Sequence, residues 1–159
     1  KKNFKGPNQL NKFNNIKVNR RDLLDEPKIE NAISEQGVRE NLNEGIEYMA
    51  FWMIGTGCCV VNYLMADAAT CEVSRAQLWV WLKYKVKLDD GRIVDEKLID
   101  KLIKDELNKI KKRFLAWKER TGDKSLDHVS FESAAKIFKD MITKENFDDF
   151  LTLSLYEKI

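Results

Sequence analysis

The sequence predicts an all-α protein, a bundle of about five helices. Residues that favour helices, such as Lys, Glu, Leu, Ala and Ile, are common, whereas the 159 residues include only 7 Gly and 2 Pro. Apolar residues recur at spacings of three and four over several segments, which is the helical period. We find no strand–turn–strand alternation and no internal repeat. The length, with 43% hydrophobic residues, is enough for one domain with its own core.

Charge and composition favour neither a nucleic-acid nor a membrane partner. The formal net charge is only +2, and the basic run "KIKKRFLAWKER" has the pattern of a solvated helix face. No stretch approaches the ~20 apolar residues that a bilayer span needs. The cysteines, Cys58, Cys59 and Cys71, are a poor disulfide framework, because their number is odd and two are adjacent. We therefore expect reduced thiols and a cytoplasmic protein.

The first part of the chain is expected to hold an arm and then a long helix. Residues 1–30 are polar and contain both prolines, so they are predicted to be a linker or arm, with a brief turn at "RRDLLDEP". A helix is predicted from Ser34, a good N-cap, to about Met53, with "GTG" ending it. Its inward positions, at helical spacing, are Val38, Leu42, Ile46, Met49 and Met53.

The next segment, 58–81, is apolar on nearly every face. The run "CCVVNYLM" fits either a buried strand or a buried connection, and periodicity does not decide between them. After Met65 the residues favour a helix that is mostly enclosed, because few charges occur before Lys83. The tryptophans are expected in the core; they are Trp52, Trp79, Trp81 and Trp117.

The last half of the chain is predicted to be helical with two breaks. "LDDGR" is a turn signal, and Asp95 can cap a long helix that runs to about Arg120. "TGDKS" should end that helix, and another is predicted over 131–142. The tail "ENFDDFLTLSLYEKI" is expected to hold a short helical turn.

Asp67 is the residue that most invites a functional interpretation. Its nearest charged neighbours in the sequence are Glu47 and Glu72, whereas charges elsewhere come every two or three residues. An aspartate at a helix start would cap the free N–H groups of the first turn. Alternatively, a carboxylate in an apolar pocket would be desolvated, which raises its pKa toward the working pH and suits a general base. The two interpretations are compatible.

Other chemistry has weaker support in the residues. The single histidine, His128, lies in a polar loop, and turn formation explains Asp89 and Asp90, so we expect no metal site in this chain. A cysteine nucleophile would need a nearby histidine. No glycine-rich phosphate loop is present.

Several segments together resemble a known family. "GPNQL", "RRDLL", "GVRENLNEGIEYMAFWMIGTGC", "NYLMADAATCEVSRAQLWVWLKYKVKLDDGR" and "FDDFLTLSLYEKI" closely resemble the C-terminal part of malate synthase, from about Gly6 to the end. The stretch from Leu64 to Trp79 is the most specific, and the tail looks like the family's C-terminus. The resemblance implies residues 1–30 as a linker from a preceding (β/α)8 barrel, and residues 31–159 as the C-terminal helical domain.

The resemblance also implies a reaction and a role for two residues. Malate synthases condense acetyl-CoA with glyoxylate and water to give malate and CoA, in the glyoxylate cycle. Their helical domain carries the catalytic base, the aspartate of an "LM-x-DAAT" motif, which falls on Asp67 here. Met65 is then a wall of the acetyl-CoA site. Mg²⁺ ligands are expected in the barrel rather than in this chain.

Two departures from the family pattern qualify what is expected. The residue before the base is commonly Glu in the family but is Ala66 here, which removes a negative charge. The barrel has no counterpart in this sequence, so we expect the chain alone to be inactive. An alternative is a non-catalytic helical module that binds a partner through an exposed apolar face. The C-terminal "EKI" lacks the Ser-Lys-Leu peroxisomal signal, although peroxisomes or glyoxysomes remain an alternative location.

Overall fold

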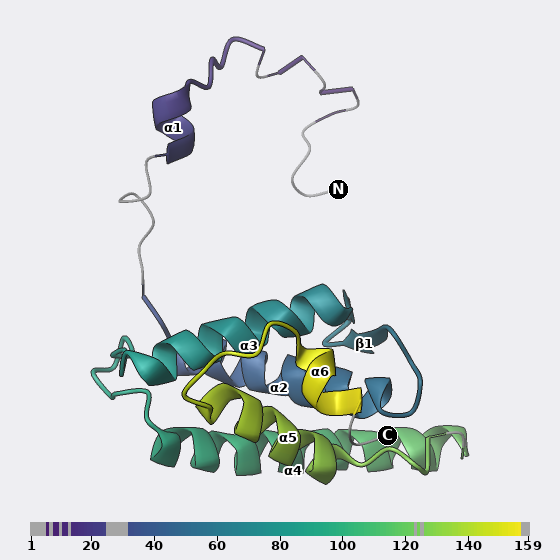
Figure 1. Cartoon of the computed structure of the whole chain (residues 1–159). Coiled ribbons are helices and arrows are strands. Elements are labelled where there is room, and N and C mark those ends of the chain that lie inside the picture. The colour runs from purple at the N-terminus through teal and green to yellow at the C-terminus, as the bar shows by residue number, and fades with distance from the viewer. Residues whose placement is uncertain are drawn as a thin grey trace. The chain divides into compact units, whose positions relative to one another are not determined.

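The structure is a computed structural model, and it describes residues 6, 8, 9, 11, 12, 14–24, 32–122, 124 and 126–156. The chain divides into two units, residues 1–31 and 32–159. The described part of the first unit contains one helix, α1 (Arg20–Leu24), which has no buried residue and forms where a brief turn was predicted. The site discussed below lies entirely in the second unit (Figure 1).

Helix α2 (Glu35–Trp52) is the central helix of the second unit. Ser34 caps it as predicted, because its hydroxyl oxygen accepts from the Gly37 N–H at 3.1 Å. The predicted inward positions Val38, Leu42 and Ile46 are fully buried. Helix α2 packs against α3 (Ala68–Lys83), α4 (Glu96–Thr121) and α5 (Phe131–Thr143), which surround it in Figure 1.

The second unit confirms the predicted all-α class, with five helices, α2 to α6, among its described residues. Asp95 caps α4 by accepting from the Leu98 N–H at 2.7 Å, and Gly122 ends that helix with a φ of +66°. Helix α5 follows the N-cap Ser130. The short α6 (Leu151–Tyr156) lies in the predicted apolar tail.

The segment that the sequence left open between a strand and a connection forms a small β-hairpin. Strands β1 (Cys59–Val61) and β2 (Leu64–Ala66) pair antiparallel, with Val60 opposite Met65. Each strand has only three residues, too few for a visible alternation, and the turn contains no glycine. Asn62 and Tyr63 nevertheless both have positive φ, 50° and 65°, as a two-residue hairpin turn of type I′ requires.

The apolar segment is also less enclosed than predicted. On the hairpin, Val60 of β1 and Met65 of β2 are 71% and 69% exposed, so neither strand is fully buried. Helix α3 buries Cys71, Ser74, Arg75 and Leu78 but exposes Val73, Val80 and other residues on its outer side. The four tryptophans are half-buried at the edge of the core rather than inside it.

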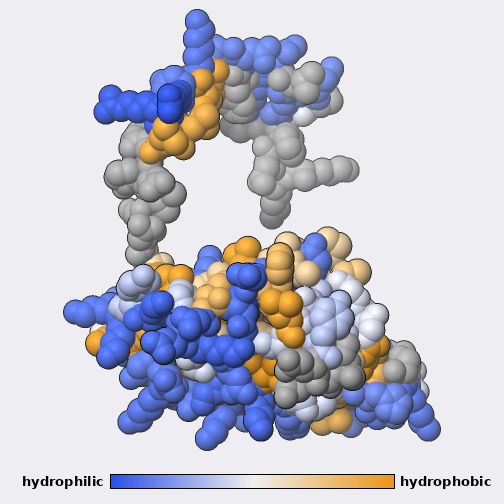
Figure 2. Space-filling model, in the orientation of Figure 1, coloured by the Kyte–Doolittle hydropathy of each residue, from blue (hydrophilic) through white to orange (hydrophobic). Residues whose placement is uncertain are grey.

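Figure 2 shows apolar side chains along the edge of the helical unit at which α3 runs, next to a largely hydrophilic surface. Among the described residues, no helix is long and apolar enough to cross a membrane.

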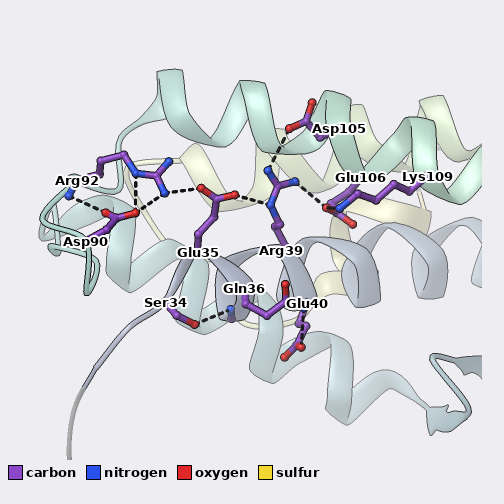
Figure 3. A network of polar contacts seen from close by, with 11 residues as sticks. Ser34, Glu35, Gln36, Arg39, Glu40, Asp90, Arg92, Asp105, Glu106 and Lys109 are labelled. Carbon is purple, nitrogen blue, oxygen red and sulfur yellow. Dashed lines mark hydrogen bonds and ion pairs between the residues drawn. The ribbon is translucent and has the colours of Figure 1, made fainter.

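A network of ion pairs fixes the start of α2 against α4 (Figure 3). The Arg39 guanidinium donates to Glu35, Asp105 and Glu106, at 2.6, 3.1 and 2.8 Å. Arg92, in the turn before α4, also binds Glu35. These donations hold the pKa of the Glu35 carboxyl below its usual range, with the hydrogen bond from Arg92 the largest cause and that from Arg39 the next.

Candidate active site

Asp67 lies at the junction of β2 and α3, where it caps the helix. Its backbone is extended, with φ −125° and ψ −173°. Its Oδ1 atom accepts from the Thr70 N–H at 3.1 Å and from the Thr70 hydroxyl at 3.4 Å. The N-cap interpretation is therefore confirmed.

The capping bonds occupy only one oxygen of the Asp67 carboxylate. Both bonds end on Oδ1, and within the described residues no hydrogen bond reaches Oδ2. The side chain is half-buried, so it is held by the helix yet accessible from outside the unit. One oxygen that is fixed and another that is unoccupied are what a positioned proton acceptor needs.

The hairpin presents one apolar face next to Asp67. Side chains alternate along a strand, and Ala66, at 2% exposed, turns inward opposite Cys59. Met65 therefore turns outward, and the extended backbone at Asp67 continues the alternation and places that residue on the same side. Val60, the cross-strand partner of Met65, joins this face. Sequence reasoning missed Val60, because only the strand register places it beside Met65.

The hairpin is anchored to α2 and α4 by polar contacts. Asn62 donates from its Nδ2 atom to Asn43 Oδ1 of α2 at 3.3 Å, and its Oδ1 atom accepts from Arg113 Nη1 of α4 at 3.5 Å. Arg113 also pairs with the buried carboxylate of Glu47. Burial is the largest influence on Glu47 and raises its pKa, although the bond from Arg113 opposes this effect. A groove of about 580 Å³ lies beside these residues, and Val60 is among the residues that line it.

The thiols of Cys59 and Cys71 are poor candidates for a proton acceptor or nucleophile beside Asp67. Burial raises the pKa of Cys59 to about 11 and raises the pKa of Cys71 further, so both thiols are protonated at neutral pH. His128 is exposed in its loop. Over the described ranges, no group of three or more His, Cys, Asp or Glu side chains could hold a metal ion.

Comparison with known proteins assigns the chain to a family. The family model described as "Malate synthase, C-terminal" matches residues 32–159, which is most of the chain. The chain belongs to the malate synthase family. The match begins after residues 1–31 and includes Asp67 and Met65, the residues that the resemblance singled out.

Individual malate synthases agree with this assignment. The chain is 39% identical over 157 residues to the malate synthase of Myxococcus xanthus and 35% identical over 160 residues to the glyoxysomal malate synthase of Candida tropicalis. Each match covers 98% of this chain but only 27% of the relative. The glyoxysomal malate synthase of Cucurbita maxima is 38% identical over 141 residues, which cover 87% of the chain and 23% of that protein. The chain thus spans about a quarter of the length of the curated relatives that it matches.

Proposed function

We propose that this chain supplies the catalytic base of a malate synthase, and that Asp67 is that base. The observation that carries the proposal is the carboxylate of Asp67, which holds α3 through Oδ1 and keeps Oδ2 unoccupied among the described residues. Membership in the family supports the reaction, the condensation of acetyl-CoA with glyoxylate and water. The apolar hairpin face beside Asp67 supports Met65 as a contact of the acetyl-CoA.

The proposed step is a proton transfer from carbon to oxygen. Oδ2 of Asp67 removes a proton from the acetyl methyl group, which is weakly acidic because it is α to a thioester. The resulting enolate forms a carbon–carbon bond to the aldehyde carbon of glyoxylate. Water then cleaves the thioester, which gives malate and CoA. The exposed Met65 and Val60 would exclude water from the methyl group when the face is covered.

A metal ion has no evident place among the described residues of this chain, since they contain no suitable cluster. On the basis of the family resemblance, we propose that a barrel preceding this chain in the full-length protein binds Mg²⁺ and glyoxylate. Residues 1–30 would then link that barrel to the helical unit. Such an ion would act as a Lewis acid on glyoxylate. We also propose that the chain by itself does not turn over substrate.

The deciding experiment compares two aspartates that cap helices in the same way. Asp67→Asn and Asp95→Asn are made in the full-length protein, and malate formation is measured. Asparagine is as good an N-cap as aspartate, so both variants should keep their stability. Asp67→Asn should lower turnover by orders of magnitude with glyoxylate binding unchanged, whereas Asp95→Asn, whose cap geometry is nearly identical, should remain active. Near-normal turnover of Asp67→Asn would sink the proposal.

A stability measurement separates the two roles of Asp67. Asp67→Ala removes both the cap and the base, so it should lose activity and about 1 kcal/mol of stability. Asp67→Asn should lose activity alone. If activity followed stability across the two variants, the residue would be only a cap.

The alternative is a non-catalytic helical module that binds a partner through its apolar edge. Figure 2 supports it to the extent that apolar side chains gather where α3 runs. The coding sequence upstream of Lys1 distinguishes the two, because a barrel there supports the enzyme and a start codon near Lys1 supports the module.

The cellular location is a separate proposal. We propose the cytoplasm, and keep the peroxisome or glyoxysome as the alternative because two of the three relatives described above are named glyoxysomal. Microscopy of the tagged full-length protein in its own cells tests this choice. Signal confined to peroxisomes or glyoxysomes would favour the alternative.

A further inference from the structure

The segment after α5 crosses α3 and is fastened to it. We call residues 144–156 the C-terminal strap; in Figure 1 it is the yellow-green to yellow segment that passes α3 and ends in α6. The strap begins where the Trp79 indole N–H donates to the Lys144 carbonyl oxygen at 2.8 Å. It ends with Leu151 and Leu155, both buried in the core.

Arg75 holds the middle of the strap. This α3 side chain is fully buried, and its Nη2 atom donates to the backbone carbonyl oxygen of Asp148 at 2.9 Å. The guanidinium carbon lies 3.9 Å from the ring centroid of Phe147. Arg75 therefore contacts two consecutive strap residues, one through a hydrogen bond and one through a ring.

Glu72 links Arg75 to the start of α6. Its Oε2 atom accepts from Arg75 Nε and Nη2, at 2.9 and 2.6 Å. Its Oε1 atom accepts from the Leu151 N–H at 2.6 Å. Positions 72, 75 and 79 are three and four residues apart, so one face of α3 carries these three attachments of the strap.

These attachments specify orientation more than they add stability. A buried charge pair is often no more stable than apolar residues of the same volume, because both charges lose water. Arg75 also has a buried Nη1 atom without a hydrogen-bond partner among the described residues. Apolar side chains would cover α3 equally well, but they would not fix the position of the strap along the helix. Directional hydrogen bonds fix which strap residue lies opposite each residue of α3.

The same helix begins directly after its N-cap, Asp67. Its first two residues, Ala68 and Ala69, are exposed, and Cys71 is the first residue of α3 that is buried in the core. Glu72 follows directly and binds both Arg75 and the first residue of α6, Leu151. We propose that Glu72 and Arg75 are positioning residues, which fix the first turn of α3 through the strap and so fix the direction in which Asp67 is presented. This inference rests on the proposed role of Asp67.

The first test measures the helix start without any activity assay. Hydrogen exchange is followed by mass spectrometry on the 159-residue chain, in Arg75→Met and in Leu102→Ala, a control that destabilises the α4 core. Arg75→Met should speed exchange of amides 70–72, the first bonded amides of α3, at least about tenfold while α4 stays protected, as local opening allows. Leu102→Ala should not speed exchange at the start of α3 more than elsewhere in the unit. Unchanged exchange at 70–72 in Arg75→Met would overturn the proposal.

The second test uses the full-length protein and acetyl-CoA deuterated at its methyl group. Misplacing a reacting group by about 1 Å can cost up to about 100-fold in rate, so Arg75→Met should lower kcat by about 10- to 100-fold. The KM for acetyl-CoA should change less than twofold. The deuterium isotope effect on kcat should rise, because proton removal becomes more rate-limiting. Arg75→Lys, which keeps the charge but not the fork of donors, should fall between wild type and Arg75→Met.

The outcomes separate this inference from the proposed function. An inactive Asp67→Asn with a fully active Arg75→Met would leave the base in place and overturn the positioning role. An active Asp67→Asn would overturn the base, and the positioning role with it. If Arg75→Met does not fold, Glu72→Gln keeps an oxygen for the Leu151 N–H but replaces the oxygen that accepts from Arg75 with an NH2 group, which cannot accept. It should then show the same isotope-effect rise, more weakly, and no rise would refute the inference.

Discussion

Two glycines in the same helix should respond oppositely to substitution by alanine. A Cβ atom built on Gly45 of α2 would lie 2.1 Å from Phe138 Cζ and 2.4 and 2.5 Å from the two Cε atoms of that ring. A Cβ on Gly37 would meet only Ser34 Oγ, at 3.6 Å, which is ordinary contact. Both glycines lie within the helix, so alanine suits the backbone at either position and only the surroundings differ.

The magnitude follows from the space around Phe138. Ordinary contact of a Cβ atom begins at 3.4 Å, and the nearest ring atom lies at 2.1 Å, so the ring would have to retreat by about 1 Å, yet Phe138 is fully buried. Such overpacking costs about 3 kcal/mol, and alanine returns about 1 kcal/mol of helix propensity. Gly45→Ala should therefore lose about 2 kcal/mol, whereas Gly37→Ala should gain up to about 1 kcal/mol.

Urea unfolding of the 159-residue chain, followed by circular dichroism, measures both changes. Phe138→Leu supplies the decisive control, because leucine lacks the three ring atoms that the new Cβ would strike. Phe138→Leu alone should cost stability, but the double variant should lose at least about 1 kcal/mol less than the sum of the single losses. Equal effects of the two alanines, or additive losses in the double variant, would refute the close contact of α2 with α5.

Three further substitutions or treatments test separate features. Tyr63→Asn should gain up to about 1 kcal/mol, because Tyr63 has a φ of +65° and a fully exposed ring; a loss in urea unfolding would show that the ring contributes. Glu35→Gln should cost about 1 kcal/mol at pH 7, since the lowered pKa of Glu35 stabilises the fold above the unfolded pKa of about 4.3. That cost should vanish as pH falls through the lower folded pKa, and a cost that persists in acid would argue against the ion pairs. Iodoacetamide at pH 8 should label the exposed Cys58 first, Cys59 slowly and Cys71 only in denaturant, as mass spectrometry would show; early labelling of Cys71 would contradict its burial.

Local rules predicted what is local in this fold. The caps at Ser34, Asp67 and Asp95 were predicted from residue type and the pattern that follows, because an N-cap bonds an N–H only three residues away. The inward face of α2 followed from its spacing for the same reason. The hairpin was missed because its strands are short and its turn lacks glycine, so no local rule detects it.

The candidate site was predicted only in part, for a related reason. Asp67 and Met65 came from the resemblance to malate synthases, which compares a long stretch at once. Val60 required the pairing register, which the sequence does not show. The attachment of Glu72 to Leu151 joins residues 79 positions apart, and no spacing rule reaches that far.

The structure also bears on the two interpretations of Asp67, a cap and a base, which were compatible from the residues alone. Asp95 shows what capping by itself requires, since it accepts from the Leu98 N–H with the same extended backbone conformation. Asp67 does the same with Oδ1, but it follows an exposed apolar face and keeps Oδ2 unoccupied among the described residues. Capping therefore does not account for the surroundings of Asp67, and it supplies the rigidity that a base on a helix start would need.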